Sequence, residues 1–308
     1  MRAPLRRLLI ALGVTIAVAG ACAHSRPAPE HVAVPVAEFA TDPDAITISW
    51  VGHATVLIGI RGHWFLTDPV LGERIAKIYP RKVAAAIRPD ELPPLDAILI
   101  SHAHFDHLDL PSLRQLGAVP LLVPPGVRSI LPGDLPEHPV VVETWDTWTA
   151  GDVRITAVPA SHGDGRYGVD LWRHRAHTGW VIQVGDRTVY FAGDTGYVPA
   201  QAQALAGRFR IDVALIPVGP AGRAHWIERW RAKVHANPDD ALALFRDTGA
   251  RFMVPIHYGT FFGAPDRERP LVLAAIARAH LADRVRAIDI GATAVFAGYS
   301  TRVMMWNP

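Results

Sequence analysis

The chain has little or none of several features that would assign it to familiar classes of protein. It has one cysteine, Cys22, in 308 residues, so it cannot form an internal disulfide. Its 31 basic and 29 acidic side chains leave a formal net charge of +2, which provides no field for binding nucleic acid or another polyanion. No internal repeat is visible in the sequence. Half of the residues are hydrophobic, which is enough for the core of one large domain.

The N-terminus has the pattern of a secretory signal. A basic start precedes an apolar run from Leu8 to Val18, which is too short for a comfortable transmembrane helix. Small residues then lead to Cys22, and this arrangement resembles a bacterial lipobox. We therefore predict a lipoprotein signal peptide over residues 1–21, lipidation of Cys22, and a location in the bacterial cell envelope, on the periplasmic face of a membrane. An ordinary cleaved signal and an uncleaved anchor are the alternatives.

The rest of the chain divides into a tether and one domain. Residues 22–44 contain several prolines and many alanines without a periodic apolar pattern, which indicates an extended tether. The domain covers residues 45–308. Apolar patterns predict one group of strands over 46–67 and 97–158, and a second group over 179–192 and 212–304. Helices are expected between these strands, near residues 110–117, 199–208, 238–247 and 270–281.

One segment of the domain is rich in metal ligands. Residues 97–100 form a short apolar run that predicts a buried strand. Four side chains that can bind metal follow within six residues, namely His102, His104, Asp106 and His107. In an extended chain alternate residues point the same way, so the first two histidines share one direction while the adjacent Asp and His reach a second point. This division suits two metal ions, and the mixture of imidazole and carboxylate favours zinc, with iron or manganese as alternatives.

This motif resembles the metallo-β-lactamase superfamily. The wider segment from Glu91 to Asp109 resembles the branch that contains N-acyl-phosphatidylethanolamine-hydrolysing phospholipase D, and a more distant relative is the ascorbate-6-phosphate lactonase group. The resemblance covers about residues 46–300. It implies an α+β fold, the αββα four-layer sandwich, in which two mixed sheets pack face to face with helices outside.

The resemblance extends to motifs before and after this segment. His162, Asp194 and His257 each follow a short apolar strand, as His102 does, and match the family's remaining metal ligands. The implied assignment places His102, His104 and His162 on one metal, Asp106, His107 and His257 on the other, and Asp194 between them. Asp68 is expected to hold ligand imidazoles through their free N–H groups. His53 has either a similar supporting role or a purely structural one.

Several residues are expected on the substrate side. Asn237 and Pro238 predict a helix start, so His235 lies in the loop before it and is expected to donate a hydrogen bond or a proton to substrate. Asp106 is counted as catalytic as well as metal-binding. The predicted substrate contacts are Tyr197, Arg223, Trp226 and Trp230, since aromatic rings beside cations suit a lipid–water boundary. A core-packed pair of tryptophans is the alternative reading of the last two.

Three functions are compatible with these residues. The first is a two-zinc phosphodiesterase of the phospholipase D type, acting on N-acyl-phosphatidylethanolamine or a related membrane glycerophospholipid through a hydroxide that bridges the metals. The second is a lactonase or carboxylic ester hydrolase, because the same nucleophile would attack a carbonyl carbon. The third is a non-catalytic metal-binding lipoprotein. The oligomeric state is left open.

Overall fold

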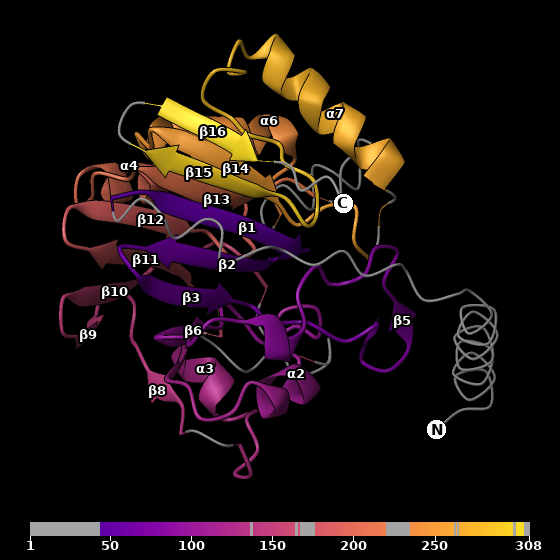
Figure 1. The fold of residues 1–308 in the computed structure, drawn as a ribbon. Coiled ribbons are helices and arrows are strands. Elements are labelled where there is room, and N and C mark those ends of the chain that lie inside the picture. The colour runs from indigo at the N-terminus through magenta and orange to yellow at the C-terminus, as the bar shows by residue number, and fades with distance from the viewer. Residues whose placement is uncertain are drawn as a thin grey trace, which may run out of the picture.

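The computed structural model describes residues 44–135, 138–163, 166, 176–219, 235–261, 263, 265–297 and 300–304 (Figure 1). The predicted signal peptide and all of the predicted tether except Asp44 lie outside these residues, and so do Cys22, Arg223, Trp226 and Trp230. Within the described residues, no helix is long and apolar enough to cross a membrane.

The first sheet has eight strands in the order β16-β15-β1-β2-β3-β6-β7-β8. They are β1 (Ile46–Gly52), β2 (Thr55–Ile60), β3 (His63–Thr67), β6 (Ala97–Leu99), β7 (Leu121–Val123), β8 (Val140–Val141), β15 (Thr293–Ala297) and β16 (Ser300–Met304). The antiparallel run β1-β2-β3 is the hairpin pattern that alternation predicted, and β3, β6, β7 and β8 then pair in parallel.

The second sheet has six strands in the order β14-β13-β12-β11-β10-β9. They are β9 (Thr147–Ala150), β10 (Val153–Val158), β11 (Gly179–Val184), β12 (Arg187–Phe191), β13 (Val213–Pro217) and β14 (Phe252–Ile256). Strands β12, β13 and β14 are parallel, and β13 and β14 are buried at every position, as continuous apolar runs covered on both faces must be.

The predicted grouping of the strands was wrong at both ends. Residues 147–158 were assigned to the first sheet, but β10 pairs antiparallel with β11, from Val153 opposite Val184 to Val158 opposite Gly179. Residues 293–304 were assigned to the second sheet, but β15 pairs with β1, with Ala294 opposite Ile48. Apolar periodicity identifies a strand and its buried face but carries no information about its neighbour, so sequence order was a poor guide to sheet membership.

The helices are α2 (Leu110–Gln115), α3 (Pro125–Arg128), α4 (Pro199–Ala206), α6 (Pro238–Asp247) and α7 (Pro265–Arg278), with a 3₁₀ turn, η2, at Pro89–Glu91. The first, third and fourth of these match the predicted helices. Helix α7 begins five residues before its predicted start and contains Pro270. A proline inside an apolar pattern normally marks a helix boundary, which is why the first turn was missed.

Buried side chains connect these elements into four layers. Ile58 and Trp50 of the first sheet and Trp180 of the second lie in one apolar cluster, so the sheets pack face to face. The same cluster includes residues of α4, α6 and α7, such as Phe245, while α2 and α3 pack with β6 and β7 in a separate cluster. In Figure 1 α2 and α3 lie below β3 and β6, and α7 lies at the top beyond β16. The αββα sandwich is therefore confirmed.

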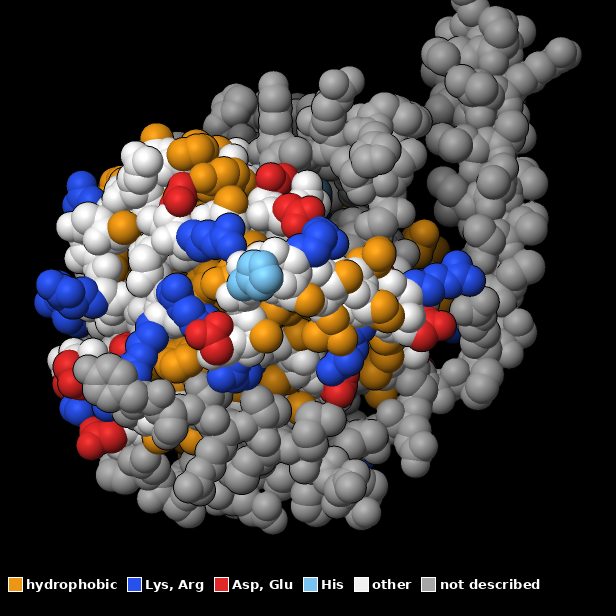
Figure 2. Space-filling view, turned by 90° about the horizontal axis from the view of Figure 1, so that it is seen from above, with side chains coloured by type: hydrophobic (Ala, Val, Ile, Leu, Met, Phe, Trp, Pro, Cys, Tyr) orange, Lys and Arg blue, Asp and Glu red, His pale blue; other side chains and the backbone are white. Residues whose placement is uncertain are grey.

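The charged surface agrees with the near-neutral composition. Seen from above, basic and acidic side chains are interspersed over the described part of the face (Figure 2). Ion pairs such as Arg278 with Asp239, at 2.9 Å, join α7 to α6 on the outside of the fold.

Candidate metal centre

The predicted ligands come together because they follow strands that end at one edge of the sandwich. Asp68 follows β3, His102 follows β6, His162 follows β10, Asp194 follows β12 and His257 follows β14. Loops at strand ends are where sheet-based folds present functional side chains. Strand pairing therefore gathers residues that are far apart in the sequence into one site.

The first group contains three histidines. The Nε2 atom of His102 lies 3.0 Å from Nδ1 of His104, and Nε2 of His162 lies 3.1 Å from the same Nδ1 atom. These three nitrogen atoms are close enough to share one ion. Burial lowers the pKa of His102 well below its ordinary value, so this imidazole is neutral, which is the form that binds metal.

The second group contains Asp106, His107 and His257, together with His53. The Nε2 atoms of His107 and His257 are 3.2 Å apart, and Nε2 of His53 lies 3.0 Å from Oδ2 of Asp106. Burial is the main reason why the pKa of His53 is lowered to about 3. His53 is thus a neutral imidazole beside the Asp106 carboxylate. It offers a nitrogen atom that lies within 4.8 Å of the ligand atoms of Asp106, His107 and His257, so it could bind the same ion.

Asp194 lies between the two groups. Its Oδ1 atom is 3.1 Å from Nε2 of His257, and its Oδ2 atom is 3.3 Å from Nε2 of His107 and 4.0 Å from Nε2 of His162. Burial alone would raise the pKa of Asp194, but His257 and His107 hold it well below its ordinary value. The carboxylate is therefore ionised. Both of its oxygens lie beside imidazoles of the second group, and Oδ2 also approaches His162 of the first group.

The turn around Asp194 also positions its neighbours. Gly193 has φ +60°, and a Cβ atom there would lie 2.5 Å from Cβ of Ser101, so only glycine fits. On the other side, Thr195 Oγ1 accepts a hydrogen bond from the Ser161 backbone, next to His162, and its carbonyl accepts one from Ala236, next to His235. One short turn thus fixes three loops of the site.

Asp68 supports two of the imidazoles from behind. Its Oδ2 atom is 2.7 Å from Nδ1 of His107 and accepts a 2.5 Å hydrogen bond from the Ser101 hydroxyl, which is in turn 2.9 Å from Nδ1 of His102. These contacts leave the Nε2 atoms of both rings facing the site, which is the arrangement that orients metal-binding histidines. Ser101 was not predicted, although its position directly between the strand and His102 was a usable signal.

The donor set fits divalent metal ions. Nitrogen and carboxylate oxygen atoms converge without lysine or arginine among them, and Oδ1 of Asp194 is buried with no hydrogen-bond donor. Although burial lowers the pKa of His107, three surrounding carboxylates (Asp194, Asp68 and Asp106) raise it well above its ordinary value. The site therefore attracts positive charge, and imidazole and carboxylate ligands suit zinc, iron or manganese.

The structure also places the predicted substrate-side residues that it describes. His235 lies in the loop before α6, with Nδ1 3.4 Å from Oδ2 of Asp194 and its ring 4.7 Å from that of His162. Its side chain is 17% exposed, so it contacts the ligands without being fully buried. The hydroxyl of Tyr197 instead donates to Asp247 at 2.5 Å, at the junction of α4 and α6.

Comparisons with known proteins agree with this geometry. A family model of a beta-lactamase superfamily domain matches residues 63–258. The chain is 33% identical over 263 residues to an uncharacterized protein of Mycobacterium tuberculosis, a match that covers 78% of this chain and 66% of that protein. It is 29% identical over 232 residues to N-acyl-phosphatidylethanolamine-hydrolyzing phospholipase D 1 of Caenorhabditis elegans, covering 69% and 64%. The chain thus spans slightly less than two-thirds of the length of these relatives.

A solved structure shares the fold. Igni18, a novel metallo hydrolase from the hyperthermophilic archaeon Ignicoccus hospitalis, superimposes with a TM-score of 0.59 at 22% identity, over 82% of this chain and 99% of that one. The family match over residues 63–258 shows that the protein belongs to the metallo-β-lactamase superfamily, and its His and Asp cluster is able to bind metal.

Proposed function

We propose that this protein is a hydrolase that binds two zinc ions and cleaves the phosphodiester bond of N-acyl-phosphatidylethanolamine or a related glycerophospholipid. The observation that carries the proposal is the position of His235, a part-exposed imidazole beside the Asp194 carboxylate that lies between the two ligand groups. The similarity to the C. elegans phospholipase, over 69% of this chain, supports the choice of substrate class.

The ligands would be divided as the two groups are. His102, His104 and His162 would hold one ion, Asp106, His107 and His257 the other, and Asp194 both. When bound, such ions lower the pKa of water and neutralise charge on a phosphoryl group. The protein's own part is to orient the imidazoles, which Asp68 does through His107 and through Ser101.

His235 supplies the proton chemistry in this proposal. Departure of an alkoxide from phosphorus is assisted when an acid donates a proton to the leaving oxygen. Histidine is a common proton donor in enzymes, and Nδ1 of His235 lies 3.4 Å from Oδ2 of Asp194, next to the ligand groups. Its loop is held at Ala236, whose N–H donates to the Thr195 carbonyl, so the ring stays near the ligands.

We also propose that Cys22 carries a lipid anchor and that residues 22–44 tether the enzyme to the periplasmic face of a bacterial membrane. A hydrolase held at a bilayer meets phospholipid without leaving the surface. The lipobox-like sequence before Cys22, the only thiol in the chain, supports this location.

The substrate class is tested with a panel of substrates. N-acyl-phosphatidylethanolamine in mixed micelles should be cleaved with a kcat/KM at least tenfold above that of an aliphatic lactone or a carboxylic ester, because the ratio of kcat/KM values is what measures discrimination. Release of N-acylethanolamine and phosphatidate identifies the bond. A higher value for the lactone would instead support the lactonase alternative.

Asp194→Asn tests the two-metal arrangement. Losing the charge that lies between the ligand groups should reduce both bound metal and turnover by well over tenfold, since even partners that only orient metal ligands cost about 10–100-fold when removed. Metal analysis and kinetics measure the two effects. Asp186→Asn, in the exposed turn between β11 and β12, is the matched control. Two full equivalents of metal at normal rates would contradict the assignment of Asp194.

His235→Ala separates proton transfer from metal binding. Turnover on the phosphodiester should fall by roughly 10²–10⁴, the usual contribution of a general acid or base, while metal content stays near that of the wild type. His138→Ala removes an exposed histidine before β8 and should change neither quantity. Loss of metal would make His235 a ligand, and an unchanged rate would make it structural.

Cys22→Ser tests the anchor. The wild-type protein should fractionate with membranes and the variant should not, because lipidation requires the thiol and no other cysteine is present. Activity on detergent-dispersed substrate should be the same for both. An unmodified Cys22 in the mature protein, found by mass spectrometry, would refute the anchor without affecting the proposed chemistry.

A further inference from the structure

Residues 102–107, the ligand loop, supply ligands to both groups, and several contacts hold their backbone. The His104 carbonyl accepts a hydrogen bond from the His107 N–H at 3.1 Å, and His102 pairs with His177 in an antiparallel bridge. Ala103, between the first two histidines of the loop, is fully buried. Because a buried carbonyl requires a hydrogen-bond donor, this residue needs a partner from outside the loop.

That partner is Arg166. Its Nη1 atom donates to the Ala103 carbonyl at 2.6 Å, and its guanidinium carbon Cζ lies 4.1 Å from the centre of the Phe105 ring. A hydrogen bond from a charged donor is shorter and stronger than one between neutral groups, and the ring is within the range of a cation–π interaction. One guanidinium group therefore contacts the ligand loop on both sides of His104.

The surroundings of Arg166 suit a group that holds the loop in place. The residue is only 7% exposed, which leaves it little surface for a substrate. Burial is the main reason why the pKa of His104 is lowered, and the nearby positive charge of Arg166 acts in the same direction. Since a positive charge repels a metal ion, any benefit of Arg166 to metal binding must come from the position that it gives to the loop.

The contacts of Arg166 join the two segments that supply the first group. Arg166 follows His162 by four residues in the sequence. Nε2 of His162 lies 3.1 Å from Nδ1 of His104, and both atoms belong to the group that would share one ion. A shift of one segment relative to the other would change the spacing of these nitrogen atoms.

The second group has anchors of its own. Oδ2 of Asp68 lies 2.7 Å from Nδ1 of His107, and Nε2 of His53 lies 3.0 Å from Oδ2 of Asp106. Both anchors belong to the first sheet, since Asp68 follows β3 and His53 follows β1. Removal of the Arg166 side chain leaves these contacts in place.

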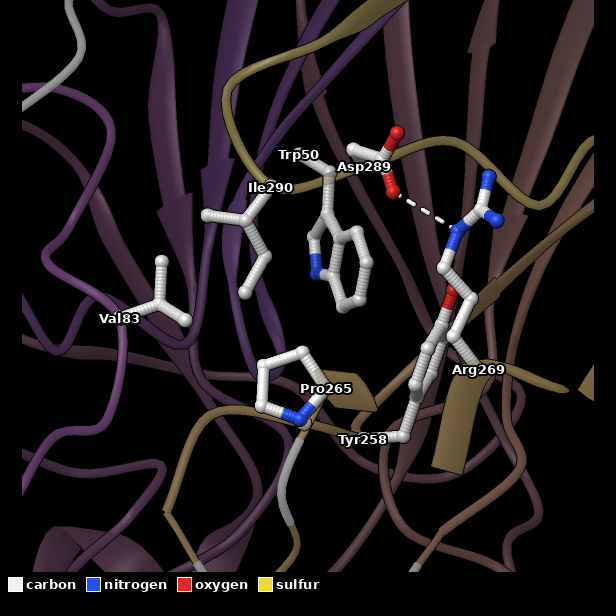
Figure 3. A pocket seen from close by; sticks show the side chains of 8 residues that line it. Trp50, Val83, Tyr258, Pro265, Arg269, Asp289 and Ile290 are labelled. Carbon is white, nitrogen blue, oxygen red and sulfur yellow. Dashed lines mark ion pairs between the residues drawn. The ribbon is translucent and has the colours of Figure 1, made fainter. Parts of the chain in front are cut away.

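His257 of the second group is held by the segment that follows it. Tyr258 packs against Trp50 of β1, with the ring centres 4.8 Å apart, in the wall of a hollow of about 190 Å³ (Figure 3). The Gly259 N–H donates to Glu268 of α7 at 2.6 Å. Strand β1 and helix α7 thus fix the backbone next to His257.

We propose that Arg166 is a positioning residue for the first metal ion. It holds the ligand loop at Ala103 and Phe105 and so fixes His104 relative to His162. The proposal rests on the two-zinc arrangement proposed above. It adds a residue that is not a metal ligand and that sets the affinity for one ion and not for the other.

The test is competition with a chromogenic chelator for the zinc of the full-length, zinc-loaded protein. Arg166→Ala should weaken the affinity for one of the two zinc equivalents about 10–100-fold, as for other partners that orient metal ligands, and leave the other unchanged. Arg166→Lys should recover part of the loss, because an ammonium can still donate to Ala103 but does not stack flat on Phe105.

The matched control is Arg208→Ala. It removes an exposed guanidinium group that lies 4.3 Å from the centre of the Trp145 ring, which is the same kind of contact away from the ligand loop. This variant should change the affinity for neither zinc equivalent.

A double variant identifies the ion that Arg166 affects. His162→Ala removes a ligand of the first group and should leave one tightly bound zinc. Adding Arg166→Ala should not weaken that remaining ion, because both changes then act on the same lost site. Thermal unfolding verifies that each variant folds, and Arg166→Met, which keeps an apolar stem beside Phe105, replaces Arg166→Ala if that variant does not.

The possible results separate this proposal from the one that it rests on. Equal weakening of both zinc equivalents would make Arg166 a general structural residue, and unchanged zinc affinity with a raised KM would make it a substrate contact. Either result overturns its positioning role. A wild-type protein that binds fewer than two zinc equivalents would instead overturn the two-zinc arrangement, and the role of Arg166 with it.

Discussion

The burial of three carboxylates at one edge of the sandwich is the constraint on which the rest of the site depends. Asp68 is 0%, Asp194 3% and the Asp106 side chain 17% exposed. Burying a carboxylate is costly unless positive charge or hydrogen bonds accompany it. At Asp106 and Asp194 the surrounding histidines overcome the effect of burial and depress the pKa, whereas at Asp68 burial prevails and raises it. The arrangement is best stabilised by cations that several of these groups share, which is what metal ions provide.

The same constraint explains strained backbone at the site. Asp68, His53 and His257 have φ values of 36°, 58° and 67°, in the left-handed region, which only a few per cent of non-glycine residues adopt, with aspartate and histidine among the more frequent of them. Each such residue costs of order 1–3 kcal/mol and persists only where its surroundings fix it. Here the His53 N–H donates to Thr260, and the His257 N–H donates to the His53 carbonyl. The strained backbone places the side chains of these three residues at the metal centre.

The features that could be predicted from the sequence are those that depend on residues close together in the chain. The ligand motif from His102 to His107 and the helix start at Pro238 were predictable because they depend on neighbouring residues: strand direction, ligand spacing and the Asn237 cap, whose side chain accepts from Asp240 at 3.0 Å. The sheets to which β10 and β15 belong could not be predicted, because strand pairing is decided by packing across the whole domain. The position of His53 beside Asp106 was ambiguous for the same reason, since it depends on β1 and the ligand loop meeting in space.

The His53 carbonyl shows how closely the two sides of this region are connected. It accepts hydrogen bonds from both the Trp50 indole and the His257 backbone, each at 2.9 Å. Trp50 belongs to the first sheet and His257 follows a strand of the second, so one oxygen atom joins the ends of the two sheets. If Trp50 moves, either its indole N–H loses the His53 carbonyl, or the carbonyl moves with it and the His257 N–H loses its acceptor. Within the described residues the strand pairing of β14 ends at Ile256, so the hydrogen bond from the His257 N–H extends the contact between the sheets by one residue and holds His257 beside His53 at the metal centre.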